Sequence, residues 1–134
     1  MDSTDRSYAE GHILDFASED KIGTALLQTF PYDGPRQRIA YETNEFSAVC
    51  PYSGLPDYGR LKVEYIPAKL IVELKSLKYY IVSFRPVGIF QEPATGRIYR
   101  DLWALLQPQW LCVTTAYNTR GGIDATCEVR SDAQ

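Results

Sequence analysis

Histidine is almost absent from this chain of 134 residues, which contains only His12. One histidine inside a polar N-terminal segment excludes most His-based metal sites, and it excludes most Cys/His or Ser/His catalytic pairs built within one chain. We therefore expect no metal site. Acid–base chemistry would have to come from carboxylates, lysines, tyrosines or water.

Cysteine is scarce and shows no pairing pattern. The chain has Cys50, Cys112 and Cys127, an odd number without CxxC spacing. Such a set encodes neither a disulfide framework nor a zinc knuckle. We therefore expect at least one free thiol.

Long apolar runs and a basic excess are also missing. No stretch approaches the roughly 18 apolar residues of a membrane helix, and the N-terminus lacks a signal pattern. The net charge is -3, whereas nucleic-acid modules are usually basic. We therefore expect a cytoplasmic protein without membrane or direct nucleic-acid partners. Because GxGxxG and P-loop motifs are absent, any nicotinamide cofactor would bind outside a Rossmann fold.

The chain length fits a single domain. Residues 1–23 are polar and acidic, which predicts a flexible N-terminal arm or a short helix, and residues 24–134 would form the domain. Strands are predicted at 38–42 with an extension over 46–49, and at 60–66, bracketing a Pro- and Gly-rich loop at 50–59. Helices are predicted at 69–85 and 95–107, and a hairpin at 110–130.

This order of elements, ββααββ, indicates an α+β fold with a four-stranded antiparallel sheet and two helices on one face. Such a sheet has two open edges, and proteins usually pair or cover exposed edges. The sequence therefore predicts a homo-oligomer. Its 10 tyrosines agree with this, because tyrosine is enriched at subunit interfaces.

Cys50 is the candidate nucleophile. A buried cysteine that only packs does not need the prolines and glycines that follow Cys50, whereas a thiol presented at a fixed angle does. Cys112 and Cys127 lie inside predicted strands, so we interpret them as packing residues. Asp57 is either a turn former or, in a chain with so little histidine, the proton donor beside the thiol.

Other charged residues allow two interpretations each. Glu92 is either a favourable charge at the start of a helix or a ligand for a base-like substrate. Lys75 and Lys78 share a helix face, which is usually only solvated. Arg120, beside Gly121, lies either at a hairpin tip or at an anion site.

Four segments in order resemble one family. CPYSGLPD (Cys50–Asp57) resembles the CPxTGxPD loop of the nitrile reductases known as QueF, and ELKSLKYY (Glu73–Tyr80) resembles their E-(S/L)-K-(S/A)-x-K-(Y/F/W) NADPH-binding signature. VGIFQEPATGRIYRDL (Val87–Leu102) is similar to their His-Glu-containing helix start, and TRGGID (Thr119–Asp124) to their hairpin. The resemblance is to the short, single-domain form.

The resemblance implies a tunnelling fold, in which sheets of several subunits close into a barrel and two rings stack. It implies NADPH-dependent reduction of the nitrile of 7-cyano-7-deazaguanine to the aminomethyl form during queuosine biosynthesis, with two NADPH per turnover. Cys50 would form a thioimide and Asp57 would donate the proton. The substrate-binding residues would be Glu92, Gln91 and Ser76. The cofactor-binding residues would be Glu73, Lys75, Ser76, Lys78, Arg120 and Gly121.

Two residues depart from the family pattern. Gln91 stands where many members have histidine, although an amide can still donate to a ligand. Gly96 replaces a frequent asparagine, and glycine can loosen a helix by up to about 1 kcal/mol. We expect the basic cofactor or charges of a neighbouring subunit to lower the pKa of Cys50.

Three alternative functions remain at this point. An amidinotransferase related to the family uses the same thioimide with ammonia, but it lacks the lysine signature. A zinc-dependent pterin-type hydrolase of the same fold is disfavoured by the missing histidines. The third is a non-catalytic binding scaffold that keeps the pocket.

Overall fold

The computed structural model describes residues 11–132, so the predicted arm lies partly outside the described residues. Its main sheet is antiparallel, with the strand order β2-β3-β5-β6. These strands span Ile39–Val49, Pro56–Ile66, Trp110–Arg120 and Ile123–Arg130. A bulge between Thr43 and Phe46 shifts the β2–β3 register. The predicted α+β order is confirmed.

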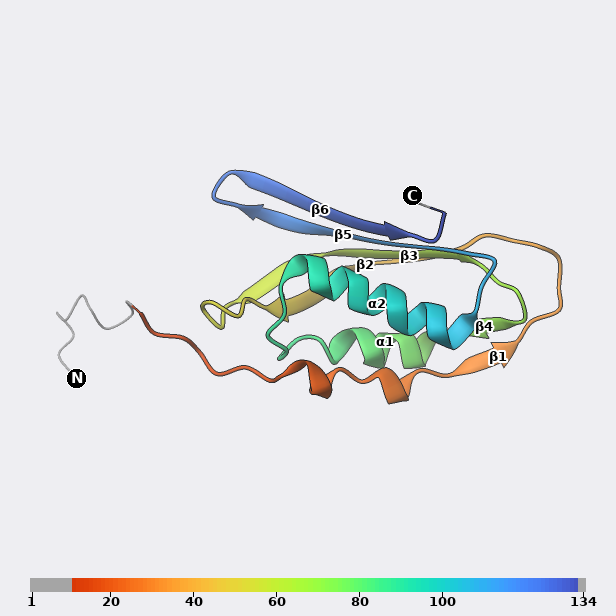
Figure 1. Cartoon of the computed structure of the whole chain (residues 1–134), viewed down its shortest axis with the longest axis horizontal. Coiled ribbons are helices and arrows are strands. Elements are labelled where there is room, and N and C mark those ends of the chain that lie inside the picture. The colour runs from red at the N-terminus through yellow and green to blue at the C-terminus, as the bar shows by residue number, and fades with distance from the viewer. Residues whose placement is uncertain (1–10, 133–134) are drawn as a thin grey trace.

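Two helices cover one face of this sheet (Figure 1). They are α1 (Leu74–Val82) and α2 (Gln91–Leu106). Ala94, Ile98 and Leu102 are fully buried at four-residue intervals, so this stripe of α2 faces the sheet. The helix ends at Gln107, which takes a left-handed conformation directly before Pro108.

The core lies between the helices and the sheet. Its large aromatic members, Tyr65, Tyr80, Phe46 and Phe84, are all fully buried. Burying each large apolar side chain contributes roughly 1.5–3 kcal/mol to stability. This layer fixes α1 and α2 against the strands, and it thereby positions the loops at the ends of the sheet.

The first helix is shorter than predicted. Residues 70–72 form strand β4 (Leu70–Val72), which pairs with β1 (Thr29–Pro31). The N–H of Val72 also donates to the buried Tyr65 hydroxyl, 3.1 Å away. The predicted helix over 69–85 was therefore wrong at its start, because pairing with a distant segment satisfies these backbone groups instead.

The second helix begins at Gln91, four residues before the predicted start at Thr95. Strand β3 begins at Pro56, so the loop between β2 and β3 is shorter than the predicted 50–59. Proline is tolerated at the first residue of a strand. Asp57 and Gly59 consequently belong to a strand.

Short 3-10 turns, η1 (Glu19–Lys21) and η2 (Thr24–Leu26), follow the start of the described chain. Ahead of them, Ala17 forms a bridge to Val87, and between them Ile22 is buried in the core. The part of the predicted arm that is described therefore docks on the domain. No helix in residues 11–132 is long and apolar enough to cross a membrane.

Candidate active site

Cys50 is the first residue of a tight connection between β2 and β3. Its N–H donates to the Leu55 carbonyl at 2.9 Å, and its carbonyl accepts the N–H groups of Ser53 and Gly54 at 3.2 and 2.8 Å. Gly54 has φ +73, a left-handed conformation that favours glycine. The thiol is therefore held by a closed turn between two paired strands.

The pKa of the Cys50 thiol lies below its ordinary value. Burial is the largest single influence and raises it, but hydrogen bonds from the Tyr52 N–H and from the hydroxyl and N–H of Ser53 act in the opposite direction. The positive charge of Arg120 adds to them. Groups of the same chain thus favour the reactive thiolate, and the expected contribution of the cofactor or of a neighbouring subunit stays a prediction.

Cys112 provides a contrast. Burial again is the largest influence, and the nearby carboxylates of Glu128 and Glu64 act with it, so its pKa is raised. Its sulfur lies 3.6 Å from a carboxylate oxygen of Glu128. An uncharged thiol is favoured there, which agrees with a packing residue.

Asp57 lies beside the turn, on β3. It is 5% exposed, and its carboxylate forms an ion pair with Arg120 from the end of β5. Arg120 is half-exposed, so the ion pair links the buried carboxylate of Asp57 to a side chain at the protein surface. The structure thereby brings three of the predicted site residues together: Cys50, Asp57 and Arg120.

Gln91 and Glu92 are held close to this group by the backbone. Val49, directly before Cys50, bridges to Gly88, with the Val49 N–H donating to Val87 and the Ile89 N–H donating to Val49. Helix α2 begins two residues after Ile89. Glu92 is exposed in the first turn, where a helix dipole favours a negative charge.

A pair of buried hydroxyls fixes the start of α2 on the sheet. The Thr95 hydroxyl donates to the Gln91 carbonyl at 2.9 Å and lies 2.7 Å from the Thr115 hydroxyl on β5. On the same face of β5, the Tyr117 hydroxyl is buried without a hydrogen-bond partner among residues 11–132. Its ring packs against Gly59, where a Cβ would lie 3.3 Å from the ring.

Two residues of the lysine signature, Glu73 and Ser76, stabilise the start of helix α1. The Glu73 carboxylate accepts the Ser76 N–H and caps the helix, and this bond, together with Lys75, holds the Glu73 pKa below its usual range. The buried Ser76 hydroxyl donates to the Glu73 carbonyl at 2.7 Å and accepts the Gln28 N–H at 3.0 Å. Their predicted contacts with ligands remain predictions.

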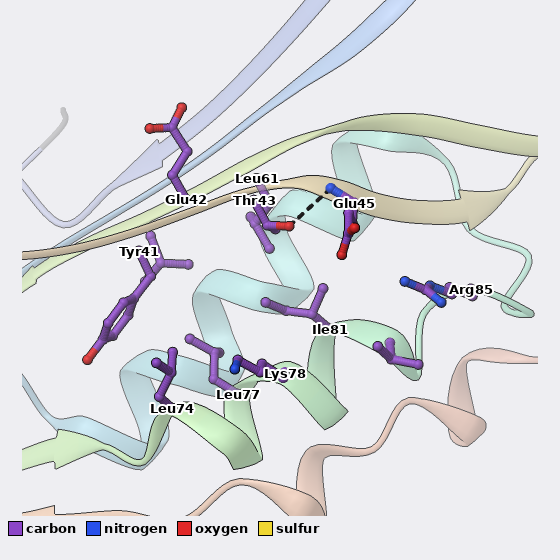
Figure 2. A pocket seen from close by; sticks show the side chains of 12 residues that line it. Tyr41, Glu42, Thr43, Glu45, Leu61, Leu74, Leu77, Lys78, Ile81 and Arg85 are labelled. Carbon is purple, nitrogen blue, oxygen red and sulfur yellow. Dashed lines mark hydrogen bonds between the residues drawn. The ribbon is translucent and has the colours of Figure 1, made fainter.

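The lysines of this signature are exposed. Lys75 lies over the Tyr79 ring, 5.7 Å from its centroid. Lys78 lines a cavity of about 370 Å³ between α1 and strands β2 and β3, together with Arg85. Figure 2 shows Leu74, Leu77 and Ile81 of α1 on the apolar side of this cavity. The lining combines these two cations with the carboxylates of Glu42 and Glu45 and an apolar wall.

Sequence reasoning grouped the lysines with Arg120 as cofactor-binding residues, and this grouping stays a prediction. Figure 1 shows the β2–β3 turn, the β5–β6 turn and the start of α2 at one end of the molecule, and α1 nearer the middle. Gly121 lies in the β5–β6 turn, with φ +57 and open space around its Cα. Among the described residues, those lining the cavity that contains Lys78 do not include Cys50.

Sequence reasoning assigned no roles to Ser53, Thr95 and Arg85. The CPYS sequence carried a signal for Ser53, since the amides and hydroxyls of a tight turn point back toward its first residue. The Thr95–Thr115 bond and the position of Arg85 depend on tertiary packing, which left no mark in the local sequence.

Comparisons with known proteins agree with this geometry. The chain is 56% identical over 92% of its length to an NADPH-dependent 7-cyano-7-deazaguanine reductase of Thermotoga petrophila, covering 90% of that protein. It is 46% identical over 87% of its length to a protein of the same name from Caldicellulosiruptor bescii, covering 91% of it.

A solved structure, the apo form of an archaeosine synthase named QueF-Like, matches the fold. Its TM-score is 0.65 at 22% identity, over 76% of this chain and 99% of the other. This likeness confirms the predicted tunnelling fold. The model of the family described as QueF-like protein matches residues 56–134. The chain therefore belongs to the QueF-like family.

Proposed function

We propose that this protein reduces the nitrile of 7-cyano-7-deazaguanine to the primary amine of the 7-aminomethyl product, with NADPH, in queuosine biosynthesis. The single observation that carries the proposal is the Cys50 thiol, whose pKa is lowered within a turn that also faces the Asp57–Arg120 pair. The relatives at 56% and 46% identity bear the name of this activity.

The covalent step uses Cys50 and Asp57. The sulfur forms a bond to the nitrile carbon, and a proton transferred through Asp57 reaches the nitrile nitrogen, which gives a thioimide without loss of atoms. Reduction of the thioimide to the amine takes four electrons, so two NADPH molecules bound in turn would each supply one hydride, two protons would accompany them, and the Cys50 thiol would be released. While attached, the half-reduced carbon is kept on Cys50 and away from water.

Substrate recognition falls to the start of α2. The exposed carboxylate of Glu92 accepts N–H groups of the deazaguanine ring, and the Gln91 amide donates to a ring acceptor. The Thr95–Thr115 bond fixes this turn against β5, so both side chains approach the substrate from a rigid base. Lys75, Lys78 and Arg85 would hold the phosphates of NADPH, and Lys78 and Arg85 line the cavity beside α1.

We infer that the protein is a homo-oligomer in which a neighbouring copy completes the site. Among the described residues, Cys50 does not line the cavity that contains Lys78 and Arg85. The open edges of the sheet, β2 and β6, supply the surfaces for that association.

The decisive experiment is intact-mass spectrometry after mixing the protein with 7-cyano-7-deazaguanine alone. We expect wild type to gain the mass of one substrate, C50A to gain nothing, and C127A, which removes another half-buried thiol, to behave like wild type. NADPH should then discharge the adduct, with two NADPH oxidised per nitrile. An adduct that consumes ammonia and no NADPH would indicate the amidinotransferase, and no adduct would leave only a binding scaffold.

A further inference from the structure

Residues 13–17, called the strap here, lie against two parts of the site at once. The Leu14 N–H donates to the Ser53 carbonyl at 3.0 Å. Further along, the Ala17 N–H donates to the Pro86 carbonyl at 2.7 Å, and the Ala17 carbonyl accepts the Gly88 N–H at 2.9 Å. The strap thus joins the nucleophile turn to the segment that leads into α2.

Both contact points are glycines with no room for a side chain. A Cβ on Gly54 would lie 2.2 Å from the Leu14 carbonyl oxygen, and a Cβ on Gly88 would lie 2.1 Å from the Phe16 ring. Contacts this short force one partner to move. The strap therefore lies directly on the backbone of the turn and of the segment before α2.

The side chains of the strap contribute little to the core. Ile13, Leu14 and Phe16 are 58%, 55% and 41% exposed. Stabilisation by apolar burial scales with the area removed from water, so a strap this exposed adds little of it. The strap is held instead by its backbone hydrogen bonds. These bonds constrain the two segments that they join, the Ser53 turn and the segment before α2.

Those segments hold the groups that determine the reactivity of Cys50. Ser53, whose carbonyl the strap binds, supplies the hydroxyl and the N–H that act on the thiol. Gly88, bound by the strap on one side, is bridged on its other side to Val49, the residue before Cys50. A displaced strap would leave both supports of the thiol free to move.

We propose that the strap is a positioning element of the active site, which holds the Tyr52–Ser53 turn in the conformation that presents its donors to Cys50. The proposal rests on the proposed function only in taking Cys50 to be the nucleophile. Its residues do not touch the reacting atoms, and they act through Ser53.

The test removes one hydrogen-bond donor in the full-length protein. L14P deletes the N–H that binds Ser53, and the matched variant L14A keeps it. Alkylation of Cys50 by iodoacetamide, followed peptide by peptide against pH, reports the thiolate fraction. We expect L14P to shift the profile to higher pH and to slow the reaction at pH 7 about threefold to tenfold, since one pKa unit changes that fraction about tenfold. L14A should match wild type.

Protection of the buried Cys112 shows in the same digest whether each variant is folded. A folded L14P with the wild-type Cys50 profile would overturn the proposal. If L14P exposes Cys112, that variant is not folded, and the proposal is tested instead by comparing G54A with G122A. Both glycines have nearly the same backbone, φ +73 and +76, but only Gly54 faces the strap, whereas Gly122 has open space. G54A should shift the profile and G122A should not, and equal profiles would overturn the proposal.

Alkylation needs neither the nitrile nor NADPH, so the two proposals fail separately. A shifted profile in L14P, with no substrate adduct on wild type, would retain the strap and reject the reductase. An adduct on wild type, with an unshifted profile in L14P, would do the reverse.

Discussion

At the scale of single residues, the surroundings of each acid or thiol decide which protonation state is favoured. Amides and a hydroxyl that donate to Cys50 favour its thiolate, whereas carboxylates beside Cys112 favour its thiol. Glu73 follows the same rule, because an amide of the first turn of α1 donates to its carboxylate and favours the charged form. Neighbouring hydrogen-bond donors and charges thus decide whether an acidic group is charged, even when two groups are of the same residue type, as with the two cysteines.

Glu73 should make stability depend on pH. Its pKa in the folded protein lies below the ordinary 4.5, so the charged carboxylate stabilises the fold above about pH 4.5 and the benefit is lost as the pH falls through the lowered value. In E73Q the amide oxygen still accepts the Ser76 N–H but does not titrate. We expect E73Q to have a lower Tm than wild type at pH 7 and nearly the same Tm at pH 3. A difference that is equal at both pH values would contradict this.

At the scale of elements, one carboxylate joins three segments of the helical layer. Asp101 on α2 accepts the Tyr80 hydroxyl of α1 at 2.7 Å, the Thr24 hydroxyl of η2 at 3.0 Å and the Arg97 guanidinium at 2.9 Å. Tyr80 is fully buried. A buried donor left without its acceptor loses more free energy than an exposed one, so this contact ties α1 to α2.

D101A should therefore destabilise the protein by about 2–4 kcal/mol, because it leaves the Tyr80 hydroxyl and the Nε–H of Arg97 without their acceptor, while the Arg97 guanidinium keeps its bond to Thr24. E42A removes only an exposed carboxylate that pairs with Arg60, and it should change stability by less than about 1 kcal/mol. Urea denaturation of both variants measures these differences. Equal midpoints for D101A and E42A would show that the contact contributes no more than a surface ion pair.

The elements also show where sequence reasoning succeeds. Strands with alternating apolar residues, such as Leu61, Val63 and Tyr65, were predictable, because one face must be buried. Residues 70–72 were not, since Ile71, Leu74 and Leu77 also fit a helical period and only pairing with β1 decides between the two. The site follows the same division: the Cys50 turn was readable, but the ion pair of Arg120 with Asp57 joins distant segments.

At the scale of the whole molecule, the main sheet has two open edges. Among residues 11–132, β2 has β3 as its only neighbouring strand and β6 has β5, so the outer edge of each presents backbone groups without a strand partner, apart from the bridge of Val49 to Gly88. Residues along β6 are exposed or half-buried in the isolated chain. We propose that association through these edges brings the Lys78 cavity of one copy toward the Cys50 of another.

Prolines at two adjacent positions of β6 test this association. In an antiparallel edge strand, successive N–H groups point alternately toward the partner strand and outward. Of A125P and T126P, one removes an N–H from the pairing with β5 and weakens the fold, whereas the other removes only an outward N–H. We expect the second to keep its circular dichroism spectrum but to dissociate in light scattering coupled to gel filtration, and to lose NADPH oxidation while retaining the Cys50 adduct. A wild-type protein that elutes with the mass of one chain, or two folded variants with the wild-type mass, would exclude association through this edge.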